Sequence, residues 1–139
     1  AAKISSLSRD PSEVLAGEKA ALLPLLAARP ERRGKLAFHS PCTLQHGLQI
    51  RGSIEVLLQS AGYDLTPVAD SHLCCGSAGT YSVLQPELAG MLRANKLAAL
   101  NAGGPALAAT ANIGCLTHLQ AGSSLPVRHW IELIDEVLA

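Results

Sequence analysis

The chain has 139 residues, 48% of them hydrophobic and 16% charged, and its 11 basic and 11 acidic residues balance to a formal charge of zero. This length and apolar content predict a single folded globular domain and exclude a disordered chain. The neutral balance and the 3% aromatic content disfavour a nucleic-acid-binding protein, because such proteins present basic surfaces and aromatic side chains that stack on bases.

The first long apolar segment is rich in Ala and Leu and spans residues 11–28. It predicts a helix on the surface, because Asp10 or Ser12 suits the N-cap and Pro11 suits the first turn. Pro24 cannot donate a backbone hydrogen bond inside a helix. We therefore expect Pro24 to kink or split the helix and the segment to form two shorter pieces.

Short apolar runs then alternate with helical patterns through residues 35–139, which we expect to form the main domain after a helical lead-in of residues 1–34. This alternation predicts an α/β fold in three layers, a short and mostly parallel four-stranded sheet with helices on both faces. His129 is expected to cap the last helix, which spans residues 129–138. The helix expected over residues 80–100 has an alternative, later start at Pro86. The expected strands are residues 35–39, 63–68, 106–111 and 125–128, and the expected helices are 45–61, 80–100, 115–120 and 129–138.

All four cysteines of the chain follow a predicted strand. Cys42 follows the first strand, the adjacent Cys74 and Cys75 follow the second, and Cys115 follows the third. Loops at the carboxyl ends of parallel strands meet at one edge of the sheet, where α/β proteins bind their ligands. The sequence therefore predicts that the cysteine loops converge and that the thiolates share one inorganic partner.

His118 stands three residues after Cys115 on the predicted helix. Residues at this spacing lie on one helical face, so the two side chains are candidates to bind a common centre. A helix N-terminus also favours the thiolate form of a cysteine, which is the form that binds metal.

Four kinds of site remain open for these residues. An iron–sulfur cluster accommodates Cys74 and Cys75 best, because adjacent cysteines can bind different metal atoms of one cluster. A mononuclear zinc site would use three or four thiolates with His118, although paired zinc ligands are usually spaced further apart. A disulfide between neighbouring cysteines is strained, and a nucleophilic cysteine with His72 or His118 as its base leaves three thiols unexplained.

The residues around the cysteines carry weaker signals. Gly76 and Gly79 allow a tight turn whose amides can donate hydrogen bonds to sulfur, although an ordinary helix entry would explain them equally well. His39, His46 and His72 flank the cysteines. They are candidates for cofactor-binding or proton-coupled roles, with local hydrogen bonding as the alternative.

At these residues the sequence resembles the cysteine-rich CCG domain, whose pattern is a cysteine, then Cys-Cys-Gly, then Cys-x-x-Cys. The domain occurs in heterodisulfide reductase, in lactate-utilisation iron–sulfur proteins and in the iron–sulfur subunit of glycolate oxidase, and the runs here look most like the last of these. The final cysteine of the pattern is His118 in this chain, a difference that bears on the type of cluster. The resembling runs are His39–Gly47, Asp70–Tyr81, Asn112–Gln120 and Val127–Leu133.

The resemblance implies an electron-transfer module that holds an iron–sulfur cluster of the 4Fe-4S type, with zinc as the alternative metal. Electrons would pass from flavin-containing glycolate oxidase subunits towards a quinone-type acceptor. The alternative is a zinc-binding or metal-free structural domain of such a complex. Ferredoxin-type modules normally precede this domain, and a start at Ala1 without methionine suggests a non-catalytic piece of a longer chain.

The location of the protein follows from what the sequence lacks and from its cysteines. No apolar run reaches the roughly 20 residues of a membrane-spanning helix, and residues 1–10 lack the apolar core of a secretory signal. Four cysteines in a chain of this class are more typical of the metal ligands or catalytic thiols of an intracellular protein than of disulfides. We therefore expect no transmembrane segment and a cytoplasmic location, including the inner face of the cell membrane.

Overall fold

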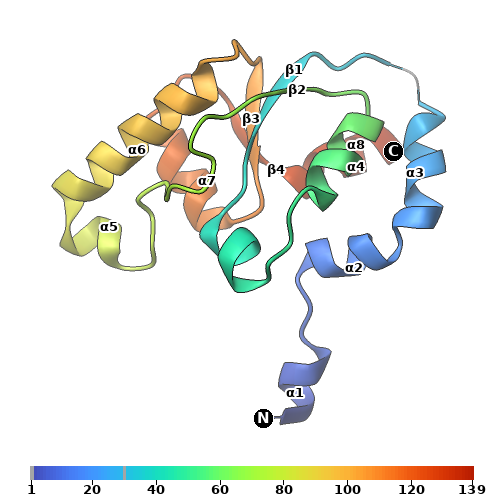
Figure 1. The fold of residues 1–139 in the computed structure, drawn as a ribbon, viewed down its shortest axis with the longest axis horizontal. Helices are drawn as coiled ribbons and strands as arrows, with labels where there is room; N and C mark the ends of the chain where they lie inside the picture. The colour runs from blue at the N-terminus through green and yellow to red at the C-terminus, as the bar shows by residue number, and fades with distance from the viewer. Residues whose placement is uncertain (1, 30) are drawn as a thin grey trace.

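The computed structural model describes residues 2–29 and 31–139, and its centre is one sheet of four parallel strands in the order β2-β1-β3-β4 (Figure 1). The α/β class and the parallel sheet expected from the sequence are confirmed. The strands are β1 (Lys35–His39), β2 (Asp64–Thr66), β3 (Leu107–Thr110) and β4 (Val127–His129).

Two groups of helices cover the two faces of the sheet (Figure 1). On one face α3 (Lys19–Ala27), α4 (Ser53–Ser60) and α8 (Trp130–Leu138) share a core with strand residues such as Phe38. On the other face lie α6 (Pro86–Asn101) and α7 (Ile113–Gln120), whose leucines pack with Ala37 and Ala108. In the described part of the chain, no helix combines the length and the apolar character needed to cross a membrane.

The register of the central strands decides which side chains face which layer. β1 pairs with β3 so that Ala37 lies beside Ala108 and His39 beside Thr110. Because side chains alternate along a strand, Phe38 faces α4 and α8, whereas Ala37 and His39 face α6 and α7. The last residue of β1 therefore points its side chain to the same side of the sheet as Ala37.

The N-terminal part contains two helices that precede α3. α1 (Ala2–Leu7) buries none of its residues and stands apart from the sheet (Figure 1). α2 (Pro11–Gly17) begins as expected, with Asp10 as the N-cap and a capping box to Glu13. The boundary of the domain at residue 34 stays a prediction.

The Ala- and Leu-rich segment forms two shorter helices as expected, but they divide at Glu18, and the prediction that Pro24 marks the division is wrong. Pro24 lies inside α3, where it removes one backbone hydrogen bond. Leu22 and Leu26, on either side of it, are buried in the core with α4 and α8. Their burial holds the turn together, so this segment supplies core residues as well as surface.

The single helix expected over residues 45–61 is also wrong, because two elements occupy this segment. A short π-helical turn, η1 (Thr43–Gly47), is followed by α4 from Ser53 onward. Gln49 and Gly52 between them have φ angles of 56° and 74°. A left-handed backbone cannot continue a right-handed helix, so the chain must restart its helix after Gly52.

The helix expected over residues 80–100 starts at Pro86, the later of the two starts that the sequence offered. α5 (Tyr81–Leu84) is a single turn, and α6 begins at Pro86. Gln85 between them has a φ of −131°, in keeping with the rule that a residue before proline avoids the helical region.

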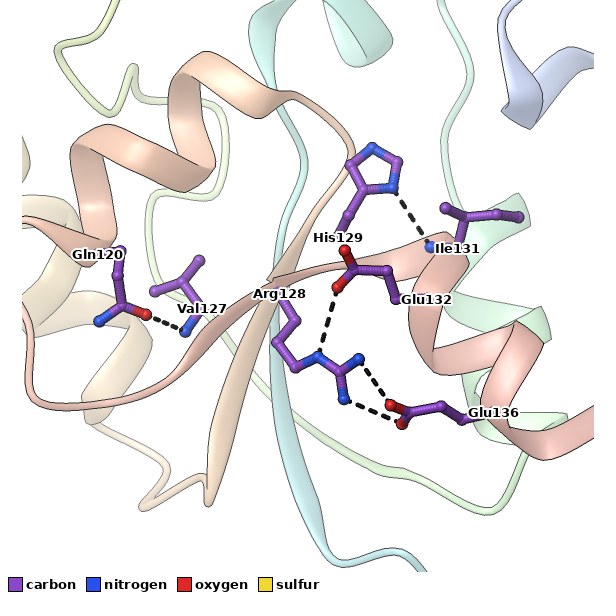
Figure 2. A network of polar contacts seen from close by, with 7 residues as sticks. All are labelled: Gln120, Val127, Arg128, His129, Ile131, Glu132 and Glu136. Carbon is purple, nitrogen blue, oxygen red and sulfur yellow. Dashed lines mark hydrogen bonds and ion pairs between the residues drawn. The ribbon is translucent and has the colours of Figure 1, made fainter. Parts of the chain in front are cut away.

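The corner between β4 and α8 is held by polar contacts (Figure 2). Arg128 binds the carboxylate of Glu136 with two nitrogens, at 2.7 and 2.9 Å. The Nδ1 atom of His129 accepts a hydrogen bond from the backbone of Ile131 at 3.4 Å, so His129 caps α8 as predicted. Gln120 joins α7 to β4 by accepting from the Val127 amide at 2.8 Å.

Candidate metal centre

The four cysteines line a single cavity at the carboxyl ends of β1, β2 and β3. The cavity has a volume of about 350 Å³. All four thiols are free, so no disulfide occupies the site. The three cysteine loops converge, as predicted from the position of each cysteine after a strand of a parallel sheet. The cysteines are Cys42, Cys74, Cys75 and Cys115.

Two short helical elements place the outer members of this set. Cys42 is the N-cap residue of η1, directly after β1 and Pro41. Cys115 lies in the first turn of α7, where the side chain of Asn112 caps the helix. The Asn112 oxygen accepts hydrogen bonds from the amides of Gly114, at 2.9 Å, and Cys115, at 3.1 Å. This cap fixes the backbone that carries the Cys115 thiol.

Cys75 and Cys115 form a buried inner pair, with exposed fractions of 1% and 8%. Their sulfur atoms lie 3.1 Å apart, which is a hydrogen-bond distance and well beyond the roughly 2.05 Å of a disulfide. The bond from Cys115 and, to a smaller extent, the nearby imidazole of His39 together lower the pKa of Cys75 to about 4, against the opposing effect of burial. The same bond, together with burial, raises the pKa of Cys115. The inner pair therefore holds one thiolate ready to bind metal.

Cys42 and Cys74 form a half-buried outer pair nearer the solvent. Burial raises the pKa of Cys42, and the neighbouring Cys74 raises it further. The backbone amide of Gly76 donates a hydrogen bond to the sulfur of Cys74 at 3.3 Å. An amide placed in this way stabilises negative charge on sulfur, as expected for this glycine.

The two glycines of the loop have different constraints. Gly76 has a φ of 93°, and a Cβ atom there would collide with the carbonyl oxygen of Ala89 and lie 3.1 Å from Leu92. Gly79 has a φ of 60° and lines the cavity, but no atom stands within 4 Å of where its Cβ would lie. Gly76 is thus required by both conformation and space, and Gly79 by conformation alone.

The histidines predicted to support the site lie in different places. His39 is buried, and one of its ring nitrogens lies within 4.8 Å of the sulfurs of both Cys75 and Cys115. His72 is exposed. None of the three histidines is among the residues that line the cavity, and the Nε2 atom of His118 lies 3.3 Å from the carbonyl oxygen of Ala89 on α6.

Two buried polar side chains that the sequence analysis did not single out hold the loop before Cys74. Lys96 of α6 donates to the carbonyl oxygens of Asp70, at 3.0 Å, and Ser71, at 3.4 Å. Gln45 of η1 donates to Ser71 from the other side, also at 3.4 Å. Burial lowers the pKa of Lys96 below its ordinary value, and the negative charge of the nearby cysteines only partly opposes this shift. In the sequence, Lys96 stands out only as a lysine among apolar positions of a predicted helix. The sequence does not show which groups its side chain contacts.

The donor set fits an iron–sulfur cluster or a thiolate-bound metal ion. Four sulfurs on one cavity, one of them with a strongly lowered pKa, are the ligands that such groups require. The buried ring of His39 adds a nitrogen donor beside two of the sulfurs. The chemistry of the donors therefore supports a metal centre.

Comparison with known proteins agrees with this donor set. The family described as the cysteine-rich domain, CCG, matches residues 36–120. The chain is 49% identical over 138 residues to the glycolate oxidase iron-sulfur subunit of Escherichia coli, covering 99% of this chain and 33% of that protein. It is 27% identical to lactate utilization protein A of Shouchella clausii, over 73% of this chain and 45% of that protein.

The chain thus spans a third to less than half of the length of these curated relatives. A third relative, the probable glycolate oxidase iron-sulfur subunit of Bacillus subtilis, is 30% identical over 63% of this chain and 20% of its own length. The match to the family model includes all four cysteines and the strands that position three of the loops. The chain belongs to the cysteine-rich CCG domain family.

Proposed function

We propose that this chain is an electron-transfer module that holds an iron–sulfur cluster of the 4Fe-4S type and works within a glycolate-oxidising complex. The cluster supplies reversible one-electron chemistry when it is bound. Cys42, Cys74, Cys75 and Cys115 are its proposed thiolate ligands. The observation that carries the proposal is that these four sulfurs line one cavity.

The size of the cavity supports a cluster over a single ion. A volume of about 350 Å³ corresponds to roughly twelve water molecules at ~30 Å³ each, more than one tetrahedral ion enclosed by its ligands requires. The inner and outer pairs of cysteines also approach the cavity from different depths, a spread that suits a group with several metal atoms.

The partners and the path of the electrons are proposed from the relatives. Two of the similar proteins are named as glycolate oxidase iron-sulfur subunits, so we propose flavin-containing subunits as the electron donor and a quinone-type acceptor. Ferredoxin-type modules of a longer chain would lie on the same path. A cytoplasmic position at the inner face of the cell membrane follows from such an acceptor.

A zinc-binding structural domain is the second candidate, and one observation favours it. His39, Cys75 and Cys115 offer three buried ligand atoms within 4.8 Å of one another, a spacing that suits a single tetrahedral ion. One outer cysteine would complete that site. Such an ion would stabilise the loops without carrying electrons.

Metal and acid-labile sulfide analysis of anaerobically purified protein, with an absorption spectrum, distinguishes the two candidates. Iron and sulfide in equal amounts with absorption in the visible range are expected, whereas stoichiometric zinc without colour would overturn the electron-transfer proposal. Cys75→Ser is expected to abolish metal binding, because it removes the sulfur with the lowered pKa.

Ala61→Ser is the matched control for this substitution. Ala61 is fully buried in the core on the opposite face of the sheet, so the variant buries the same hydroxyl far from the cavity. It should lower stability while the folded protein keeps its metal. Unchanged metal content in Cys75→Ser would contradict a site shared by the four thiolates.

A further inference from the structure

His39 is a buried histidine whose ring has no partner. Its exposed fraction is 2%, and neither ring nitrogen has a partner at hydrogen-bond distance and angle, although the ring is near enough to Cys75 to lower the pKa of that thiol. Leaving a buried polar group unpaired is costly, and about nine in ten such groups in folded proteins are paired. A ring with two unpaired nitrogens at the end of a central strand therefore indicates a partner outside the polypeptide.

Among the described residues, the buried side-chain atoms without a hydrogen-bond partner concentrate at the carboxyl ends of β1 and β3. Three of the four buried side-chain atoms without a partner belong to His39 and Thr110, and the fourth belongs to Arg33. His39 and Thr110 lie side by side in the register of β1 and β3. The carboxyl edge of the two central strands thus presents polar atoms that the surrounding protein does not satisfy.

The alternation of β1 directs His39 towards the cysteines. Ala37, two residues earlier on the same face, packs in the cluster that contains Cys75 and Cys115. A ring nitrogen of His39 and the two sulfurs all lie within 4.8 Å of one another, and all three residues are buried. Two sulfurs and one nitrogen at this spacing match the first coordination sphere of iron or zinc.

His118, the histidine in the place of the family's last cysteine, has a different environment. Its Nε2 atom lies 3.3 Å from the carbonyl oxygen of Ala89, a hydrogen-bond distance, and close to Gly76. His118 therefore joins α7 to α6, and its ring already has a partner. Neither His118 nor His39 is among the residues that line the cavity, so His39 is distinguished by its spacing to the two buried sulfurs and by its unpaired ring.

We propose that His39, and not His118, supplies an imidazole ligand of the metal centre, beside Cys75 and Cys115. This inference rests on the proposed function in requiring a metal in the cavity. The imidazole is neutral, so it would add a ligand beside the four thiolates without adding negative charge to the donor set.

Pulsed electron paramagnetic resonance of the reduced, cluster-loaded protein tests the assignment. Histidine labelled with ¹⁵N identifies any histidine nitrogen bound to the cluster, because a bound nitrogen couples far more strongly than one that only donates a hydrogen bond. We expect a strongly coupled histidine nitrogen in the wild type and in His118→Ala, and its loss in His39→Ala. Adding unlabelled imidazole to His39→Ala should restore a strong ¹⁴N coupling through the space that the substitution opens.

A coupling that survives in His39→Ala, or its absence from the loaded wild type, would overturn the assignment. His39→Gln, which retains much of the volume of the ring, serves as a second variant if His39→Ala fails to fold, and the same loss is expected. Absence of iron and sulfide from the wild type would instead overturn the proposed function. The same comparison of variants on protein loaded with Co²⁺ alone would then decide the histidine ligand for a zinc-type site.

Discussion

The two faces of the sheet are built from the same strands and have different chemistry. The face under α3, α4 and α8 is an apolar core that includes the fully buried Trp130. The face under α6 and α7 carries two buried cysteines and His39, with the buried Lys96 at its edge. Alternation along β1 and β3 separates the two, so that a single residue step changes a core position into a site position. The comparison indicates that one face supplies most of the stability and the other tolerates costly polar groups for function.

The largest effect that would test this separation is the loss of the central aromatic side chain of the apolar face. Trp130→Ala should lower the free energy of unfolding by about 3–5 kcal/mol, because it removes a fully buried indole. Denaturant unfolding measures this loss, and metal analysis of the folded fraction should give the wild-type content.

Leu100→Ala is the matched variant on the other face, since Leu100 is fully buried in the core that contains Cys75 and Cys115. It should cost about 2–5 kcal/mol and also reduce the metal content. If Trp130→Ala strips the metal from folded protein while Leu100→Ala does not, the two faces are not separate in the way described.

A smaller effect is expected at Lys96, whose ammonium group is buried against the carbonyls of Asp70 and Ser71. Lys96→Met leaves both carbonyls without this donor, at a cost of roughly 1–3 kcal/mol. It also removes a positive charge close to the cysteines, so the reduction potential of a bound cluster should fall. Potentiometric titration measures the shift.

Lys35→Met is the control for charge alone, because Lys35 is exposed at the opposite end of β1. It should leave the potential unchanged within error. Equal shifts in the two variants, or a higher potential in Lys96→Met, would show that the position of Lys96 beside the loop has no electrostatic role.

The smallest effect is expected at the corner of β4 and α8. Arg128 lowers the pKa of Glu136 by hydrogen bonding and charge, so this carboxylate stabilises the fold above its ordinary pKa. That contribution should disappear as the pH falls through the lowered pKa, and Glu136→Gln should remove it at every pH. Thermal unfolding of both proteins from neutral to acidic pH should converge at the acidic end, and a gap that widens there would contradict this account.

Much of the fold was predictable because its signals are local. Short apolar runs punctuated by glycine and proline predicted the strands, and their alternation with helices predicted the parallel order. The helix over residues 45–61 failed because Gln49 adopts a left-handed conformation that its residue type does not announce. The expected break at Pro24 failed for the opposite reason, since burial of Leu22 and Leu26 overrides the intrinsic effect of this proline.

The site was predictable up to the level of loops, and beyond that it depended on packing. The positions of the cysteines after strands were sufficient to predict that their thiols would converge. Helical spacing correctly placed Cys115 and His118 on one face of α7, but it carries no information about Ala89 on the neighbouring helix, which His118 contacts. The position of the His39 ring beside Cys75 and Cys115 depends on the register between β1 and β3, which no local sequence pattern specifies.

The glycine after the paired cysteines also determines which sequences this loop can accept. At Gly76 every other residue type meets both an unfavourable φ and the backbone of α6, whereas at Gly79 only the φ angle opposes a side chain. Asparagine and aspartate tolerate a left-handed backbone, so the second position has a short list of acceptable replacements and the first has none. The glycine of the Cys-Cys-Gly signature in this chain is thus determined by the steric fit between the cysteine loop and α6, independently of any chemistry at sulfur.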